Sequence, residues 1–549
     1  MRITKLTLTN FRSFKSAQSI ELAPVTLLFG PNSVGKSSVL MALAYVQQIL
    51  KKGHCNPQKL DALGDKNIGG FRSLVHGQDI KQSIKIRVDY DATKTPFVTY
   101  GNDVNDMANH MNFASYLLMN DFGGSIDSGA VEFEIKWSSR HEWAYVKSYR
   151  AWINDRYIGC VTSSEDLNNT GIVELNTEHP LLVPYNNGDW LESWYGSDDE
   201  RKPLEPDETH TEFEQVLNSL NPNPEDVAAV ADTESVGEIF INRVSPVGIF
   251  CRNGAIPLLG KPVITNLDGQ DFDDPEQHMN FLIVQSVLSQ AFVLPLDKLL
   301  ETLEKSIQIG PLRVVPDSDY VPNPHPEQSD WVDGSAAWSL LYKDPGSSDS
   351  IKKLIRKTSE WFSSKDKLDS GYEIINQSIS ESLYAEDFSS SQIESILNKR
   401  HVFFRELRTD ISLSANQLGT GISQVLPIIV AANSDDLGLI SVEQPELHIH
   451  PRFQVELADV FLQAKSDHSF LIETHSEHVI LRLLKRIRQT TDNELPEGFK
   501  SVTIKDVSIV YLEASEEGVI TKRINIDEDG QFLDHWPKGF FTERREELL

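Results

Sequence analysis

The most chemically informative part of the sequence is a glycine-rich loop at residues 30–37. It reads Gly-Pro-Asn-Ser-Val-Gly-Lys-Ser, follows an apolar run at 25–29 and precedes a helix-like run from residue 38. A loop of this pattern between a strand and a helix directs backbone N–H groups and the positive end of the helix at phosphate oxygens. Its lysine reaches the β- and γ-phosphates, and its last hydroxyl joins the Mg²⁺ shell. The sequence therefore predicts a site for a nucleoside triphosphate and Mg²⁺, with these residues against the nucleotide: Asn32, Ser33, Val34, Gly35, Lys36, Ser37 and Ser38.

Two apolar runs near the other end of the chain end in polar residues. The run at 437–442 leads into Glu443-Gln444-Pro445-Glu446, and the run at 469–472 leads into Glu473-Thr474-His475-Ser476. Ligands of open α/β sheets bind at the carboxyl ends of strands. A carboxylate at Glu443 can hold Mg²⁺ through water, as phosphoryl transfer requires, and His475 can contact the γ-phosphate. A glycine-rich turn at 417–426 that leads into a helix offers a second anion-binding helix N-terminus.

Composition limits the class of protein. With 81 acidic and 51 basic residues among 549, the net charge is −30, so contact with nucleic acid would need a local basic patch or another subunit. Cys55, Cys160 and Cys251 are far apart, which argues against a zinc site and a disulfide framework. The sequence has neither a signal peptide nor an apolar run of 18 residues. We therefore expect a cytoplasmic protein that makes no membrane contact.

Hydrophobic periodicity and composition divide the chain into five regions. The acidic, Pro- and Asn-rich region is expected to be a mobile surface insertion, with a specific docking arm as the alternative. The helical region lacks sustained heptads and is not expected to form a long coiled-coil arm. The regions are an N-terminal nucleotide-binding lobe (1–80), a β-rich part (81–185), the acidic insertion (186–236), a mainly helical insertion (237–400) and a C-terminal lobe with its tail (401–549).

The order of the motifs resembles the ABC-type ATPase heads of the SMC, RecF and OLD group. The motifs are N-F-R-S-F at 10–14, the phosphate loop, L-G-T-G-I-S-Q at 418–424, V-E-Q-P-E-L-H-I-H-P at 442–451 and E-T-H-S-E-H at 473–478. The resemblance implies an α/β fold, with an ABC-type P-loop head split between N- and C-terminal lobes. Glu443 would be the Walker B acid, His475 the switch histidine and 419–424 a variant signature. Arg12 would reach a phosphate, with a surface arginine as the alternative.

In such heads each site is completed by a second head. The resemblance therefore implies a homodimer or a higher even oligomer, in which ATP on Lys36, Ser37 and Glu443 of one head is capped by signature residues of the other. Binding would close the pair and hydrolysis would open it. The capping residues in this chain would be Thr420, Gly421 and Ser423.

A closer similarity is to prokaryotic AAA-family ATPases that end in a short domain of unknown function. It rests on I-G-P-L-R at 309–313, G-I-S-Q-V-L-P at 421–427 and the ending E-D-G at 528–530 with W-P-K-G-F-F at 536–541. ATPases of this type include the PtuA family of Septu and of some retron anti-phage systems. That likeness implies an HNH-type nuclease subunit, PtuB-like, as partner, and in a retron also the reverse transcriptase and its RNA–DNA product.

The motifs are compatible with more than one biological role. About 70 residues follow His475, too few for a nuclease domain of ordinary size, and no HNH motif is present, so nuclease chemistry is expected in another chain. The main hypothesis is a regulatory or sensor subunit of a defence complex that controls this nuclease. The alternatives are a RecF-like DNA-repair ATPase that acts directly on DNA, and a scaffold that binds ATP and hardly hydrolyses it.

The sequence departs from the OLD pattern at one catalytic position. Where those relatives have Glu-Glu-Pro-Glu, this chain has Glu443-Gln444-Pro445-Glu446. A glutamine orients water but cannot accept its proton, and losing a general base typically costs 10²–10⁴ in rate. Slow hydrolysis is one expectation. In the alternative, Glu446 or His475 compensates, or Gln444 orients the water as a GTPase glutamine does.

Three further groups of residues have both a functional and a structural interpretation. His448 and His450 lie on one face if they belong to a strand, which allows a metal site, but a loop toward the partner head fits them better. The pair His475 and His478 is treated in the same way. The stretch 479–489 is the most basic in the chain and could contact nucleic acid or a partner, or be a solvated helix face.

Overall fold

The computed structural model describes residues 1–93, 100, 126–176, 179, 247–265, 268, 275–317, 320–378, 400–435 and 437–534. The expected acidic insertion at 186–236 and the W-P-K-G-F-F ending lie outside these residues.

The chain divides into two compact units, each assembled from separate segments. The first unit comprises Met1–Ser19, Tyr45–Gln58 and Ile68–Thr302, and the second comprises Ile20–Ala44, Lys59–Asn67 and Leu303–Leu549. The second unit thus combines a segment from the start of the chain with its last part. The phosphate loop and the C-terminal motifs thus belong to one unit, in agreement with a nucleotide-binding head that is split along the chain.

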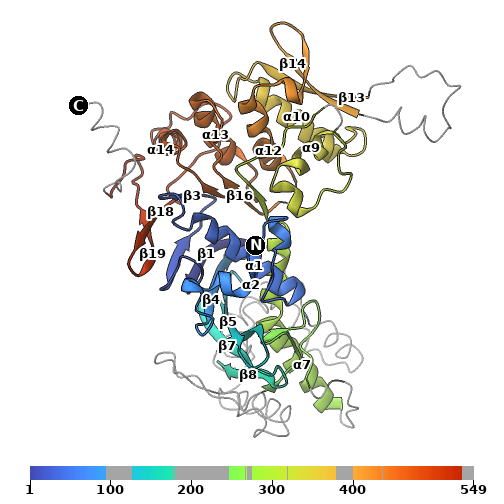
Figure 1. The fold of residues 1–549 in the computed structure, drawn as a ribbon, viewed down its shortest axis with the longest axis vertical. Helices are drawn as coiled ribbons and strands as arrows, with labels where there is room; N and C mark the ends of the chain where they lie inside the picture. Colours follow the sequence, from blue (N-terminus) through green and yellow to red (C-terminus); the bar gives the residue numbers. More distant parts are fainter. Residues whose placement is uncertain are drawn as a thin grey trace, which may run out of the picture. The chain divides into compact units, whose positions relative to one another are not determined.

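The second unit is built on a six-stranded sheet in the order β12-β16-β17-β3-β18-β19 (Figure 1). The first five strands are parallel, and β19 pairs antiparallel with β18 at the edge. β3 is buried along its whole length, as expected for a parallel strand covered on both faces. The strands are β12 (Ile307–Ile309), β16 (Leu439–Glu443), β17 (Ser469–Glu473), β3 (Val25–Phe29), β18 (Val507–Ser515) and β19 (Gly518–Ile524).

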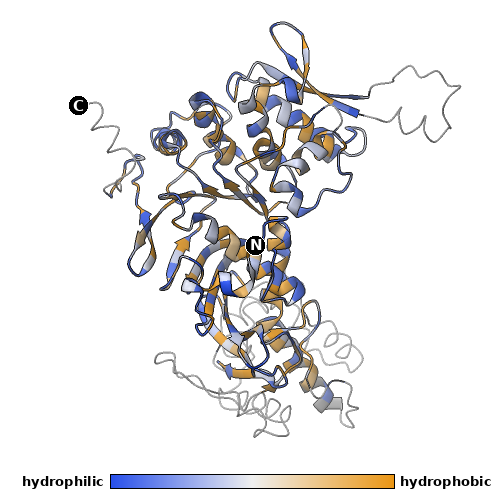
Figure 2. Ribbon diagram, viewed as in Figure 1, coloured by the Kyte–Doolittle hydropathy of each residue, from blue (hydrophilic) through white to orange (hydrophobic). Residues whose placement is uncertain are grey.

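Helices α12, α13 and α14 lie together on one side of this sheet (Figure 1). Figure 2 shows α12, β3 and β16 coloured mainly as hydrophobic, in agreement with their buried residues. A smaller sheet, β13-β14-β15, packs with α10. The remaining elements of the unit are η1 (Asp61–Leu63), η4 (Gln328–Trp331), α9 (Ser335–Leu341), α10 (Asp349–Ser363), β13 (Tyr372–Ser378), β14 (Arg400–Glu406), β15 (Ser412–Ser414), η5 (Ala415–Gln417), α12 (Thr420–Asn433), α13 (Pro451–Gln463) and α14 (Glu477–Thr491).

The first unit contains an antiparallel sheet, as the alternating pattern around 80–180 predicts. In β4, every second residue is buried, so one face of the strand packs on the core. The eight-stranded sheet has the order β2-β1-β4-β5-β6-β7-β8-β9. Its strands are β1 (Arg2–Thr9), β2 (Gln18–Glu21), β4 (Ile84–Asp91), β5 (Ser128–Ser138), β6 (Trp143–Ile153), β7 (Arg156–Ser163), β8 (Thr170–Leu175) and β9 (Val247–Gly248).

The helix α1 follows the phosphate loop and begins at Lys36. None of the helices in the described part of the chain is long and apolar enough to cross a membrane. The remaining elements are α1 (Lys36–Lys52), α2 (Gly70–Leu74), η2 (His76–Gln78), β10 (Cys251–Arg252), β11 (Ile256–Pro257), α7 (Pro275–Phe292) and α8 (Leu294–Glu304).

The longest elements described in the region 237–400, for which the periodicity predicts a mainly helical insertion, are helices. Besides helices the region contains strands β9 to β13, and a unit boundary falls within it at Thr302. Its strand β12 pairs in parallel with β16 and so belongs to the central sheet. Three residues are too few to show a period, so this strand could not be recognised from the sequence pattern.

Candidate nucleotide-binding site

The phosphate loop connects β3, which ends at Phe29, to α1, which begins at Lys36. Gly30 has φ +145°, and a Cβ on it would lie 2.4 Å from the backbone oxygen of Leu512 on β18. Gly35 also has a positive φ, 112°. Only glycine meets both conditions without strain, so these two glycines let the loop turn closely against the sheet. Along the rest of the loop, Asn32 and Ser33 are exposed and Val34 and Ser38 are buried.

Lys36 is buried, and its ammonium group is held inside the loop. Its Nζ donates to the carbonyl oxygens of Gly30 (2.9 Å) and Pro31 (3.0 Å) and lies 3.6 Å from Oε1 of Glu473. Burial lowers the pKa of Lys36, and the charge of Glu473 opposes this shift. Lys36 is also the first residue of α1, the position from which a phosphate-loop lysine contacts phosphate.

Glu473 is a site residue that the sequence argument did not single out. It is the last residue of β17, it is 9% exposed, and its Oε2 accepts a hydrogen bond from Ser37 Oγ at 2.9 Å. β17 lies between β3 and β16, which brings its carboxyl end beside the phosphate loop. The signal was present, because an ionisable residue ended an apolar strand, but the order of the strands was needed to interpret it.

Glu443 ends the neighbouring strand β16 and is the register partner of Glu473. Its carboxylate accepts a hydrogen bond from the side-chain amide of Gln308 on β12. Burial raises the pKa of Glu443; Lys66 opposes the rise and the charge of Glu473 adds to it. Ser37, Glu443 and Glu473 together offer hard oxygen donors, the ligand chemistry that Mg²⁺ prefers. The residues present thus fit the ion that the phosphate loop implies.

The turn after β16 fixes the position of Gln444. This residue has φ +44°, and its N–H donates to the carbonyl oxygen of Glu473 at 2.7 Å. Its backbone is thereby fastened to the end of β17, while the side chain is half-buried. Gln444 lies directly beside Glu443, at the strand edge where the sequence predicted it.

Glu446 contacts Thr474 and His475 in the loop that follows β17. One carboxylate oxygen accepts from Thr474 Oγ1 and the other from the backbone N–H of His475, both at 2.7 Å. Through these two hydrogen bonds, Glu446 fixes the backbone of His475 and the side chain of Thr474. Burial, and secondarily the charge of Lys36, lower the pKa of His475, so the imidazole is neutral at pH 7.

The signature segment starts α12, with Gly419 at the N-cap. Thr420 is exposed, and a Cβ on Gly421 would lie 3.1 Å from the backbone oxygen of His448. Ser423 is 1% exposed, and its hydroxyl donates to the carbonyl of Gly419 at 3.4 Å. For Thr420, Gly421 and Ser423 the capping role stays a prediction.

Arg313, the last residue of the I-G-P-L-R motif, is a second residue to which the sequence motifs assign no role. It is 5% exposed, and its guanidinium donates to the carbonyl oxygens of Gln424 (3.1 Å), Glu443 (3.0 Å) and Gln444 (3.4 Å). The side chain of Gln424 in turn donates to the carbonyl of Arg313 at 2.8 Å. Arg313 therefore joins the first turns of α12 to the end of the β16 strand.

Arg12 belongs to the first unit. It lies in the turn closed by the bridge between Phe11 and Phe14, has φ +51°, and donates its N–H to the carbonyl of Leu74 at 2.7 Å. Burial lowers the pKa of its guanidinium. Its expected contact with a phosphate stays a prediction.

The two histidines that follow β16, His448 and His450, belong to the loop that leads into α13. Nδ1 of His450 accepts the backbone N–H of Arg452 at 3.2 Å and caps α13, and His448 is exposed with φ +61°. Within the described ranges, no group of three or more His, Cys, Asp or Glu side chains could hold a metal ion. Both histidines lie in the loop between β16 and α13, in agreement with the loop interpretation.

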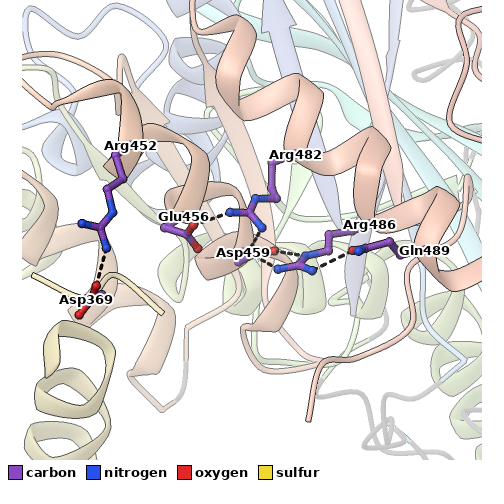
Figure 3. Close-up of polar contacts among 7 residues, drawn as sticks. All are labelled: Asp369, Arg452, Glu456, Asp459, Arg482, Arg486 and Gln489. Atoms are coloured by element: carbon purple, nitrogen blue, oxygen red, sulfur yellow. Dashed lines mark hydrogen bonds and ion pairs between the residues drawn. The ribbon is translucent and has the colours of Figure 1, made fainter. Parts of the chain in front are cut away.

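The basic stretch at 479–489 falls on α14, where half of its charge is already neutralised (Figure 3). Arg486 is buried, makes two 2.8 Å hydrogen bonds to Asp459 on α13 and lies over the ring of Phe499 at 4.2 Å. Arg482 pairs with Glu456 and with Asp459. Arg482 and Arg486 join α13 to α14. The interpretation of the stretch as a nucleic-acid contact is therefore wrong for these two arginines. Lys485 and Arg488 are exposed.

Comparison with known families identifies the family to which this chain belongs. The model of the family described as "AAA ATPase domain" matches residues 1–142 and 340–480, which is more than half of the chain. The chain belongs to this AAA ATPase family. Residues 502–549 match a second family, described as "Protein of unknown function (DUF3696)". A search of curated proteins gave no match.

The AAA ATPase match falls in two segments that contain the phosphate loop, Glu443 and His475. Together with the parallel sheet, it confirms the predicted fold class, an α/β P-loop ATPase head split between N- and C-terminal lobes. As a member of this family, the chain is a nucleotide-binding ATPase.

Among solved structures, three SMC heads resemble the chain at low sequence identity. One is an SMC head bound to the C-winged helix domain of ScpA, with 8% identity, coverage of 96% of this chain and 98% of that chain, and a TM-score of 0.39. Another is the SMC head domain from Thermotoga maritima, with 9% identity, 96% and 100% coverage, and a TM-score of 0.35. The third is the SMC head with an extended coiled coil bound to the C-terminal domain of ScpA derived from Pyrococcus furiosus, with 10% identity, 95% and 96% coverage, and a TM-score of 0.35.

Proposed function

We propose that this ATPase is the regulatory subunit of an anti-phage defence complex, whose paired heads hydrolyse ATP slowly and control an associated nuclease. The observation that supports the ATPase part is the meeting of three strand ends. β3 delivers Lys36 and Ser37, β16 delivers Glu443, and β17 delivers Glu473, all within one unit. No single segment of the sequence contains this set.

Each of these residues has a distinct task in ATP hydrolysis. Lys36 compensates the charge of the β- and γ-phosphates, and the first N–H groups of α1 bind their oxygens. Ser37 and Glu443 would hold Mg²⁺, which when bound offsets the charge that develops during phosphoryl transfer. Gln444 orients the attacking water through its amide, and the neutral imidazole of His475 lies at the same sheet edge.

Pairing of heads explains why Thr420 is exposed. The N-terminus of α12 presents N–H groups that its own helix cannot satisfy, and the residues there are Thr420 and Gly421. A phosphate held by a second head would satisfy these groups and complete the site. The assembly would then be a homodimer, or a higher even oligomer, that closes on ATP and opens after hydrolysis.

The defence role and the nuclease partner rest on sequence similarity. The match of residues 502–549 to a family of unknown function agrees with the resemblance to ATPases that end in such a domain, and that resemblance extends to Septu and retron ATPases. The partner proposed is an HNH-type nuclease of the PtuB kind, with a reverse transcriptase and its RNA–DNA product in a retron. The buried state of Arg486 gives no support to the alternative of an ATPase that binds DNA directly.

Mixing of two inactive variants tests the paired heads. Thr420→Arg should block the cap while leaving its own phosphate loop intact, and Lys36→Ala should do the reverse. Each variant alone should lose phosphate release, and a mixture should recover part of it as subunits exchange. Arg408→Thr, at an arginine that is 86% exposed on its side chain, is the control. Wild-type turnover by Thr420→Arg, independent of protein concentration, would refute the pairing.

Reconstitution tests the control of a nuclease. The ATPase is co-expressed with an HNH-type nuclease of the proposed PtuB kind, and DNA cleavage by the purified complex is measured with and without ATP. We expect the complex to co-elute and its cleavage to change with ATP only when Lys36 is intact. Cleavage that is indifferent to both ATP and Lys36→Ala would contradict the regulatory role.

A further inference from the structure

We propose that Glu473 binds the Mg²⁺ of the ATP site, and that before ATP arrives the same carboxylate neutralises Lys36. The inference rests on the proposed ATPase function, because ATP supplies further ligands of the ion. It gives a role to the buried carboxylate at the end of β17, which neither the motifs nor the family match assigns.

The distance between Ser37 and Glu473 fits two ligands of one ion. Mg²⁺ is octahedral with ligands at 2.0–2.1 Å, so two neighbouring ligand atoms lie about 2.9 Å apart. Ser37 Oγ and Glu473 Oε2 are 2.9 Å apart already. An ion that replaces the hydrogen bond between them would therefore need little movement of either side chain.

The charges of the site also favour a cation at this position. Glu473 and Glu443 are register partners on adjacent parallel strands, so both carboxylates lie at the same edge of the sheet. Two neighbouring carboxylates in a partly buried place repel each other unless a cation lies between or beside them. In the structure Lys36 compensates Glu473, at 3.6 Å, and a divalent ion would compensate both carboxylates.

The ion pair between Lys36 and Glu473 has a consequence for ATP alone. When ATP arrives without Mg²⁺, its phosphates must draw Lys36 away from Glu473 and lie near an uncompensated carboxylate. Both side chains are largely buried, so this repulsion is weakly screened by solvent. Glu473 should therefore oppose binding of metal-free ATP and favour binding of ATP with Mg²⁺.

Calorimetric titration of the full chain with ATP, in EDTA and in Mg²⁺, tests both parts. In Glu473→Gln, which keeps the shape of the side chain and removes its charge, the affinity for metal-free ATP should rise severalfold. The gain in affinity on adding Mg²⁺ should fall at least tenfold relative to wild type. Glu513→Gln is the matched control, because Glu513 is a half-exposed carboxylate on β18 that pairs with Lys522, and both affinities should stay unchanged.

The outcomes separate this inference from the function on which it rests. An unchanged Mg²⁺ gain in Glu473→Gln overturns the role of Glu473, whereas a wild-type protein that does not bind ATP overturns the ATPase site itself. If Glu473→Gln does not fold, Glu473→Asp replaces it. This variant keeps the charge but withdraws it by about 1.5 Å, so the Mg²⁺ gain should fall while metal-free affinity stays at the wild-type level. A wild-type gain in Glu473→Asp would equally overturn the inference.

Discussion

Replacing Arg313 by methionine would show whether a buried arginine sets the position of the catalytic turn. The guanidinium donates to the carbonyl oxygens of Glu443 and Gln444 and to that of Gln424 on α12. A methionine fills much of the same volume but donates no hydrogen bond. The variant therefore releases the turn after β16 while leaving the phosphate loop as it is.

Two opposing terms decide the effect of this change on stability. Burial lowers the pKa of Arg313 from 12.5 to about 10, so keeping its charge in the folded protein costs on the order of 3 kcal/mol. The hydrogen bonds of a charged donor are worth about 1.5–3 kcal/mol each, and two of the three have good lengths, 3.0 and 3.1 Å. The terms partly cancel, so we expect the variant to lose no more than about 3 kcal/mol of stability.

The same change should slow hydrolysis. A misplacement of about 1 Å at a reacting group can cost about 10²-fold in rate. We therefore expect kcat to fall 10- to 100-fold and the Kd for ATP to change less than about threefold. Phosphate release gives kcat, calorimetry gives Kd, and thermal melting checks the fold, with the exposed Arg408→Met as control. A wild-type kcat in folded Arg313→Met would refute the positioning role.

Three further predictions concern single residues. Lys36→Ala should weaken ATP binding at least tenfold, about 1.4 kcal/mol, because a buried positive charge beside the phosphates is lost; an unchanged Kd in calorimetry would contradict the phosphate loop. Gln444→Glu should accelerate phosphate release, by up to 10²–10⁴ if a missing base limits turnover; no acceleration would leave Glu446 or His475 as the group to test. Burial, with Lys465 nearby, lowers the pKa of His468 from 6.5 to about 4. Between these pH values the folded state therefore binds fewer protons than the unfolded state. Stability that is present above pH 6.5 is lost as the pH falls toward 4. The loss at pH 5 is about 2 kcal/mol, so the melting temperature of His468→Gln should fall less between pH 7.5 and pH 5 than that of wild type, and an equal fall would assign the acid sensitivity elsewhere.

Local chemistry explains which parts of the site could be predicted. The phosphate loop is contiguous, and its strand, glycines and helix follow from neighbouring residues alone. The ends of β16 and β17 were found because an apolar run stopped at polar residues. The burial of Ser423 was not predictable from the signature motif, because the face of α12 that packs on the core depends on what lies against it. The same holds for Arg486, whose charge is neutralised by Asp459 on another helix.

The sequence by itself determined that this chain has a split nucleotide site of the P-loop kind, because strand–glycine-loop–helix chemistry is local and periodicity marks buried strands. Only the tertiary structure decided which side chains complete that site. Glu473 meets Ser37 across 436 positions of sequence, and Arg313 meets Glu443 across 130. The physical reason is the order of the parallel strands: placing β17 between β3 and β16 brings their carboxyl ends to one edge, and periodicity along a strand says nothing about which strands are its neighbours.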